Sequence, residues 1–166
     1  ADFYEAVNIK SASTASIINS EIISKTVAIR ASEQDSVINA ISTNIASYGD
    51  YVISISDNAV FTGSSLNIAN LGDTGAAIQV TSKASMVLNN SNVTAKSTGV
   101  ETDSLVSISG SQMTVESMKF YEGAAITIDD SSFYTKHGII LLDNFNNENL
   151  IHISLNMKKT KLTADN

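Results

Sequence analysis

The chain has 166 residues with no proline, cysteine or tryptophan, and its 10 Lys and Arg against 17 Asp and Glu give a net charge of −7. Without cysteine there is no disulfide framework and no Cys-ligated zinc or iron–sulfur site. Arg30 is the only arginine, so the clustered cations that nucleic-acid binding needs are lacking. No run approaches the ~18 apolar residues of a membrane-spanning helix.

In chain order, residues 1–13 are predicted to form an entry strand or cap, and residues 14–166 a series of coils. Short apolar triplets recur at a nearly fixed interval, each with the period-2 pattern of a strand that has one buried face. They are Val27-Ala28-Ile29, Ile53-Ser54-Ile55, Ile78-Gln79-Val80, Val106-Ser107-Ile108 and Ile126-Thr127-Ile128, followed by Ile151-His152-Ile153. Self-similarity at this period predicts stacked coils.

Each coil is predicted to contain two further strands. The second set comprises Ala59-Val60-Phe61, Met86-Val87-Leu88, Met113-Thr114-Val115 and Leu155-Asn156-Met157, and the third set comprises Leu66-Asn67-Ile68, Val93-Thr94-Ala95 and Met118-Lys119-Phe120. Polar corners separate these two sets at Asn19-Ser20, Ser64-Ser65, Asn90-Ser91 and Ser131-Ser132. A loop bearing Gly49, Gly75, Gly99 or Gly123 is predicted to close the coil, since glycine permits a sharp corner.

Three strands per coil, each paired with its equivalents above and below, describe an all-β fold, a right-handed parallel β-helix of about six coils. The absence of proline agrees, because proline removes a hydrogen bond wherever a strand is paired on both sides. Equivalent residues, among them Ile53, Ile78, Val106 and Ile126, are expected in a single vertical file. The competing fold is a β-sandwich or Greek-key barrel, but the chain lacks Asn-Gly and Asp-Gly hairpin turns.

No cap is predicted after Leu162, and a solenoid end without a cap exposes unpaired strand edges. We therefore expect residues 1–166 to be a single β-helix domain and a piece of a longer rod.

Three runs carry a resemblance to a known family. They are Gly75-Ala76-Ala77-Ile78-Gln79-Val80, the stretch Met86-Val87-Leu88-Asn89-Asn90-Ser91-Asn92-Val93-Thr94-Ala95, and Leu105-Val106-Ser107-Ile108-Ser109-Gly110. They resemble the pertactin-like passenger repeats of Gram-negative autotransporters, and the ending from Ile153 to Asn166 is similar to the stretch before the C-terminal folding segment of those proteins. A tryptophan often stands in the family where this chain has Leu162. The resemblance covers roughly residues 36–166 and is one of repeat style.

This resemblance implies a passenger domain, secreted or displayed on the outer face of the outer membrane and carried there by a C-terminal barrel. Most passengers of this style are adhesins or self-associating factors, so a non-enzymatic module is expected. Its partners would be a host surface, an extracellular-matrix protein, a glycan or another copy of itself, with no membrane insertion by this segment. Neither a cofactor nor a metal is expected.

The enzymatic alternative is a fragment of a polysaccharide-processing β-helix, such as a tailspike or lyase. Asp129 and Asp130 with Asp57, Asp73 or Asp103 could supply a carboxylate pair or a calcium site. Adjacent aspartates at a strand end are more often solvated corner residues. A serine hydrolase is disfavoured, because the two histidines, His137 and His152, read as solvated surface residues and no G-x-S-x-G elbow occurs.

The candidate ligand-binding residues are three tyrosines. Tyr48 directly precedes Gly49, Tyr121 lies two residues before Gly123, and Tyr134 lies four residues before Gly138, so their rings are expected to line the same corner of several coils. A tyrosine offers a flat apolar face with a polar tip, which suits sugar rings or protein partners. The alternative is that these rings cover the edge of the core or pack on one another.

Overall fold

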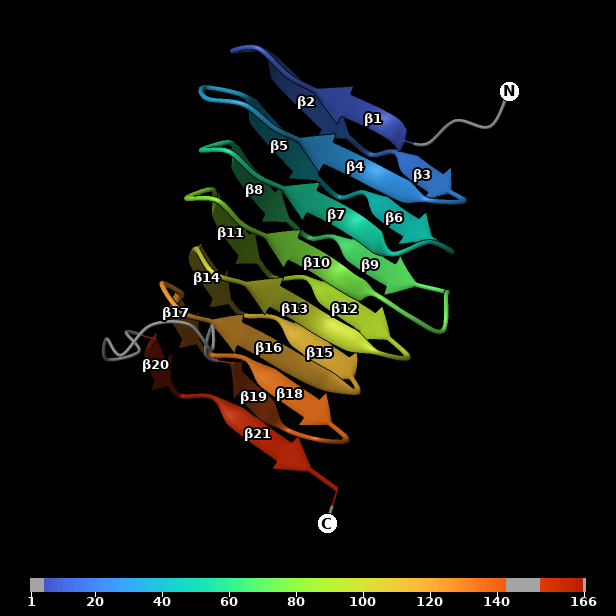
Figure 1. The fold of residues 1–166 in the computed structure, drawn as a ribbon. Helices are drawn as coiled ribbons and strands as arrows, with labels where there is room; N and C mark the ends of the chain where they lie inside the picture. The colour runs from blue at the N-terminus through green and yellow to red at the C-terminus, as the bar shows by residue number, and fades with distance from the viewer. Residues whose placement is uncertain (1–4, 143–152, 166) are drawn as a thin grey trace.

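The structure, a computed structural model, describes residues 5–142 and 153–165 of the chain. All regular elements in these residues are β-strands, and the strands form three parallel sheets of seven strands each (Figure 1). The chain visits the three sheets in turn and then repeats, so the fold is the predicted right-handed parallel β-helix with three strands per coil. The described residues contain no helix that could span a membrane.

We call the sheets A, B and C in the order in which the chain enters them. Sheet A consists of β1 (Glu5–Ile9), β4 (Val27–Ala31), β7 (Tyr51–Ile55), β10 (Ala76–Val80), β13 (Thr98–Thr102), β16 (Ser117–Tyr121) and β19 (Ile139–Leu142). Sheet B consists of β2 (Thr14–Ile18), β5 (Val37–Ile41), β8 (Val60–Ser64), β11 (Ser85–Asn89), β14 (Leu105–Ser109), β17 (Ala125–Asp129) and β20 (Ser154–Lys158). Sheet C consists of β3 (Glu21–Ser24), β6 (Asn44–Ser47), β9 (Asn67–Asn70), β12 (Asn92–Ala95), β15 (Gln112–Val115), β18 (Ser132–Thr135) and β21 (Lys161–Ala164).

Three successive strands form one layer, from layer 1 (β1–β3) to layer 7 (β19–β21). The segment expected to form an entry strand supplies β1, which pairs in parallel with β4. Residues 1–4 and the predicted strand residues Ile151 and His152 lie outside the described residues.

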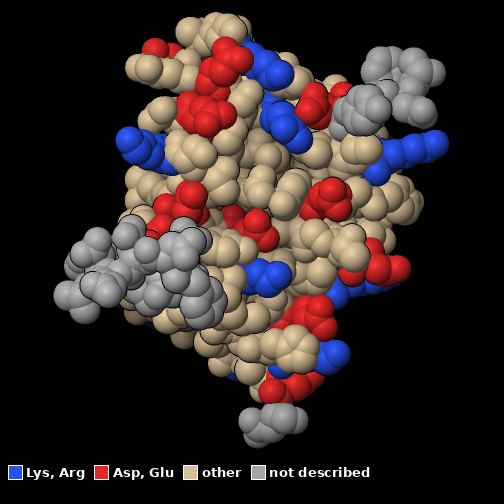
Figure 2. Space-filling view, in the orientation of Figure 1, with Lys and Arg blue, Asp and Glu red and all other residues tan. Residues whose placement is uncertain are grey.

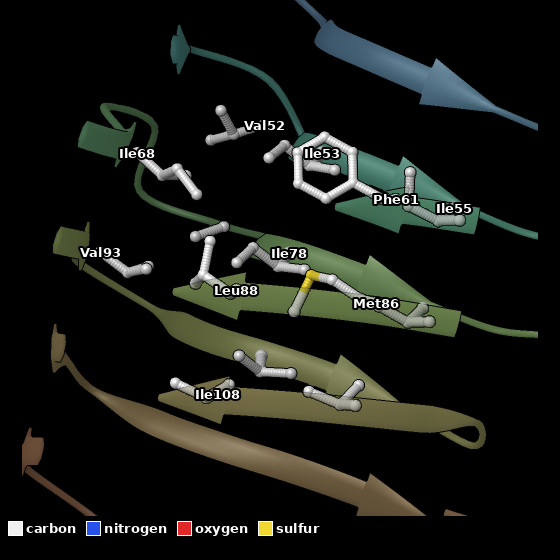
Figure 3. Packing of buried hydrophobic residues seen from close by; sticks show 14 of the residues in the cluster. Val52, Ile53, Ile55, Phe61, Ile68, Ile78, Met86, Leu88, Val93 and Ile108 are labelled. Atoms are coloured by element: carbon white, nitrogen blue, oxygen red, sulfur yellow. The ribbon is translucent and has the colours of Figure 1, made fainter. Parts of the chain in front are cut away.

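The core is a set of vertical files of apolar side chains, one residue per layer, enclosed by the three sheets (Figure 3). Sheet A contributes Val7, Ile29, Ile53, Ile78 and Val100. Sheet B contributes Ala15, Ile38, Phe61, Met86, Val106 and Ile126, and this file ends in layer 7 at Leu155, which is exposed. Sheet C contributes Ile22, Ile45, Ile68, Val93, Met113 and Phe133, and this file ends in layer 7 at Leu162, which is exposed. Since each buried methylene contributes ~0.8 kcal/mol, these files dominate stability.

The predicted single file is wrong in its lower half. Ile53 and Ile78 pair with each other in sheet A, whereas Val106 and Ile126 pair with each other in sheet B. Two other assignments change for the same reason: Met113 lies in sheet C rather than sheet B, and Met118-Lys119-Phe120 lies in sheet A rather than sheet C.

The cause is a shortening of the corner that leads from sheet C to sheet A. This corner holds residues 71–75 between β9 and β10, residues 96–97 between β12 and β13, and only Glu116 between β15 and β16. Because the corner becomes shorter, the coils of the lower layers contain fewer residues. A fixed interval of about 25 residues along the sequence therefore leads from a strand of one sheet to a strand of the next sheet. The glycines follow the same shift: Gly49 and Gly75 precede strands of sheet A, Gly99 lies within β13, and Gly123 lies between β16 and β17.

The corner between sheets B and C is the most regular part of the coil. Its first residue has a positive φ in every layer, at Asn19, Ser42, Ser65, Asn90, Gly110, Asp130 and Lys159. The next residue is a serine or threonine in every layer except layer 3, where Leu66 takes this place. The sequence predicts polar corners at these places, but two of them differ by one residue: Ser64-Ser65 is one residue early, since the structure turns at Ser65-Leu66, and Ser131-Ser132 is one residue late, since it turns at Asp130-Ser131.

Candidate functional site

The three predicted ligand-binding tyrosines do not line one corner. Tyr48 lies at the corner before β7 with 61% of its surface exposed, and Tyr134 points outward from β18 in sheet C with 45% exposed. Tyr121 ends β16 in sheet A and is half-buried. The phenol of Tyr134 donates a hydrogen bond of 2.7 Å to Asp165, and this contact raises the pKa of Tyr134. The structure therefore separates these three rings.

The candidate enzymatic residues are also dispersed. Asp57 and Asp103 lie at the corner between sheets A and B, and Asp73 lies at the corner between sheets C and A. Asp129 and Asp130 lie at the corner between sheets B and C. His137 is exposed, with its Nε2 3.3 Å from the carboxylate of Glu116. Within residues 5–142 and 153–165, no group of three or more His, Asp and Glu side chains could hold a metal ion.

A large uncharged surface covers sheets B and C and the corner between them. In layers 2 to 5 this part of the chain runs through residues 36–49, 58–72, 84–95 and 104–115 without a single Asp, Glu, Lys or Arg. We call the outward side chains of these four runs the uncharged face. A charged residue stands directly before and after each run, in the pairs Asp35 and Asp50, Asp57 and Asp73, Lys83 and Lys96, and Asp103 and Glu116. The charges therefore frame the face at its two lateral corners.

The sheet C half of the uncharged face consists of two outward columns in register. One column holds Asn44, Asn67, Asn92 and Gln112, and the other holds Ala46, Ala69, Thr94 and Thr114. The amide of Asn67 donates to Asn44 at 2.8 Å, and the amide of Asn92 donates to Asn67 at 3.1 Å. This ladder fixes the amides in one orientation at the layer spacing of about 4.8 Å.

The sheet B half of the uncharged face is more apolar. Its exposed large side chains in layers 2 to 5 are Ile41, Val87 and Leu105. Their neighbours on the same face are small and polar, such as Thr62 and Ser107. The two halves together give a surface that can be covered without removing any ionised side chain from water.

The outward face of sheet A carries charge. Arg30 forms an ion pair of 2.9 Å with Glu5, and Glu101 and Lys119 follow lower in the same sheet. In Figure 2, which has the orientation of Figure 1, acidic and basic side chains lie interspersed over the side that faces the viewer. The molecule therefore has one charged sheet face and two faces with long uncharged stretches.

A polar cluster lies at the centre of the sheet A face. Ser54, Gln79 and Glu101 occupy one register column in three successive layers. The Ser54 hydroxyl donates to Gln79 Oε1 at 3.1 Å, and Gln79 Nε2 donates to Glu101 Oε1 at 3.4 Å. We call these three residues with Tyr51 and Tyr121 the tyrosine–glutamine cluster.

The two phenols of this cluster share the field of one carboxylate. Burial raises the pKa of Tyr51, the carboxylates of Glu101 and Asp50 raise it further, and a hydrogen bond with Gln79 acts in the opposite direction. Burial and then Glu101 raise the pKa of Tyr121. Both phenols are therefore protonated at neutral pH and can donate hydrogen bonds.

Sequence reasoning missed both surfaces for different reasons. The uncharged runs are directly visible in the sequence, because each ends at a charged residue, but only a comparison between successive coils shows that they share one surface. The tyrosine–glutamine cluster requires Glu101 to lie beside Gln79, and a file that joins Ile78 to Val106 does not contain this pair. Aligning Ile78-Gln79-Val80 with Val100-Glu101-Thr102 would have found it.

The chain matches no family model, no curated protein and no solved structure.

Proposed function

We propose that the chain is an autotransporter-type passenger, displayed on the cell surface or secreted, and that it acts as a non-enzymatic adhesin through self-association. The passenger-like repeats and the parallel β-helix support the first part of this proposal. The observation that carries the adhesive role is the uncharged face, which spans four consecutive layers of sheets B and C.

The cost of dehydration favours this face as the contact surface. Burying an ionised side chain costs several kcal/mol unless it is well paired, whereas serine, threonine and asparagine need only exchange water for another partner. Each such hydrogen bond adds only about 1 kcal/mol, but the layer spacing repeats the same groups in register. Their number then sets the strength of the contact.

The occupant that fits this face best is a second copy of the chain. Asparagine and glutamine amides both donate and accept hydrogen bonds, as do the hydroxyls of Thr94 and Thr114, so the face is complementary to itself. The outward column that contains Asn92 begins at Glu21 in layer 1 and ends at Lys161 in layer 7. In an antiparallel pair of copies, each end of this column meets a charge of opposite sign.

The net charge of −7 opposes this association at long range. Salt screens exposed charges, with a Debye length of about 8 Å near 0.15 M. Self-association through an uncharged face is therefore expected to strengthen when salt is added. A contact held by surface ion pairs would weaken instead.

The test is the behaviour of beads that carry the purified chain. We expect these beads to clump with one another in the absence of any host surface, and to clump faster in 0.5 M than in 0.05 M sodium chloride, about 4 Å against about 14 Å of Debye length. Beads that stay dispersed at every salt concentration contradict self-association. If such beads attach to matrix proteins or to glycans, the chain is a receptor adhesin, and if they lower the viscosity of a polysaccharide, it is an enzyme.

A further inference from the structure

The tyrosine–glutamine cluster has the features of a built binding surface. Ser54 is buried at its base, and the hydrogen bonds from Ser54 to Gln79 and from Gln79 to Glu101 fix both planar groups. The side chains of Gln79 and Glu101 are only partly buried, so they keep free hydrogen-bonding positions towards solvent. Pre-organised side chains lose little conformational entropy when they bind a ligand.

The two tyrosines stand at opposite ends of this surface. Tyr51 begins β7 in layer 3, and Tyr121 ends β16 in layer 6, three layers further along the solenoid axis. Three layers span about 14 Å at the usual strand spacing. The carboxylate of Glu101 raises the pKa of both phenols, so both tyrosines share this central group of the cluster.

The chemistry of the cluster suits a ligand rich in hydroxyl groups. An amide and a carboxylate side by side can donate to and accept from neighbouring hydroxyls, and the phenols add two further donors. The tyrosine rings offer flat apolar faces for the carbon-bound hydrogens of a sugar ring. The carboxylate of Glu101 and the net charge of −7 disfavour an anionic ligand at the centre of the cluster, while Arg30 above Ser54 and Lys119 below Glu101 are the cations at the two ends of the same register column.

The geometry points to a binding site for a short segment of uncharged glycan that lies along the solenoid axis between Tyr51 and Tyr121. This inference rests on the proposed adhesive function, since it gives the domain a second contact surface. The site lies on sheet A, and the uncharged face lies on sheets B and C, so each can fail without the other.

The test titrates the purified chain with uncharged tetrasaccharides, namely maltotetraose, mannotetraose and chitotetraose, and with tetragalacturonate as the anionic probe. Calorimetry gives the affinity, and tyrosine fluorescence gives a second readout of binding, because the chain has no tryptophan to mask it. We expect at least one uncharged tetrasaccharide to bind, and to bind more tightly than tetragalacturonate. Binding of none of them, or preference for tetragalacturonate, overturns the inference.

The variants assign the site. Gln79→Ala removes the central amide and is expected to weaken binding by about ten-fold, which is a usual loss for a ligand hydrogen bond. Tyr121→Phe keeps the ring and removes one hydrogen-bond donor. It tests the same site if Gln79→Ala does not fold, and it is also expected to weaken binding. Tyr48→Ser, at an exposed corner outside the cluster, is the control and should bind as the wild type does. Equal binding by Gln79→Ala and wild type contradicts the site. Beads carrying Gln79→Ala should still clump, which separates this result from a failure of self-association.

Discussion

At the scale of single residues, the close approach of two coils explains why position 49 is a glycine. A Cβ atom on Gly49 would lie 2.4 Å from the carbonyl oxygen of Thr26 and 2.5 Å from its Cα. Both are backbone atoms of the coil above, which cannot move without breaking the strand pairing. Gly138 differs, because its φ of +75° favours glycine but its Cβ position is open.

These two glycines give a matched prediction. Gly49→Ala should lower the free energy of unfolding by about 3 kcal/mol, at the upper end for overpacking. Gly138→Ala should cost only about 1 kcal/mol, the usual penalty of a left-handed residue. Urea denaturation of both variants measures the difference. Equal losses would contradict the packing seen between the coils at Gly49.

A second prediction at this scale concerns pH. Because the pKa values of Tyr51 and Tyr121 are raised on folding, the two phenols contribute stability that is complete below the unfolded pKa of about 10 and is lost as pH rises through the folded values. The free energy of unfolding should therefore fall with pH above about 10. The fall should be less steep in the double variant Tyr51→Phe with Tyr121→Phe. If the free energy of unfolding falls equally steeply with pH in the wild type and in the double variant, the pKa values of these two phenols are not raised on folding.

At the scale of elements, the corner between sheets B and C is stabilised by a ladder of hydroxyls. The Ser91 hydroxyl accepts a hydrogen bond of 3.0 Å from the backbone of Leu66 in the layer above and donates one of 2.7 Å to Asn89. The backbone of Ser91 in turn donates to Ser111 at 3.1 Å, and Ser111 repeats the pattern with Ser131. Serine at this place therefore links one layer to the next.

Removing one hydroxyl from this ladder should be costly. Ser91→Ala leaves the buried amide of Leu66 without that partner, and we expect a loss of about 1–2 kcal/mol in the free energy of unfolding. Ser107→Ala, on the outward face of β14, is the control and should change it by less than about 0.5 kcal/mol. A control variant as unstable as Ser91→Ala would contradict this role.

The position of this corner can be predicted from the sequence, whereas the sheet to which a strand belongs cannot be read from the strand itself. Polar pairs such as Asn90-Ser91 mark this corner in the sequence because its first residue must adopt a positive φ, which asparagine tolerates. The apolar triplets do not mark a particular sheet, since every strand of the solenoid has the same period-2 pattern. Val106 therefore looks equivalent to Ile78, and only the shortened corner at residues 96–97 separates them. The fold is predictable from this pattern, but the pattern alone does not select Val100 over Val106 as the neighbour of Ile78, and the tyrosine–glutamine cluster depends on that choice.

At the scale of the whole molecule, the charges are sorted by surface. Sheet A carries ionised side chains along its outward face, whereas sheets B and C carry none in layers 2 to 5. A chain selected only for solubility would gain from charges on all three faces. The long uncharged stretches therefore call for an explanation other than solubility, and the proposed contact with a second copy provides one.

The most direct test of this account compares two threonine-to-lysine variants by sedimentation velocity. Thr94 lies in the uncharged face on β12, and Thr74 is exposed at the corner between sheets C and A, so both changes add one positive charge to an exposed threonine. Thr94→Lys would bury an ammonium group between the copies, and we expect it to weaken self-association by at least about ten-fold, or about 1.4 kcal/mol. Thr74→Lys should associate as strongly as the wild type or more strongly, because it only reduces the net negative charge. Equal association of Thr94→Lys and Thr74→Lys would contradict the claim that the uncharged face forms the contact.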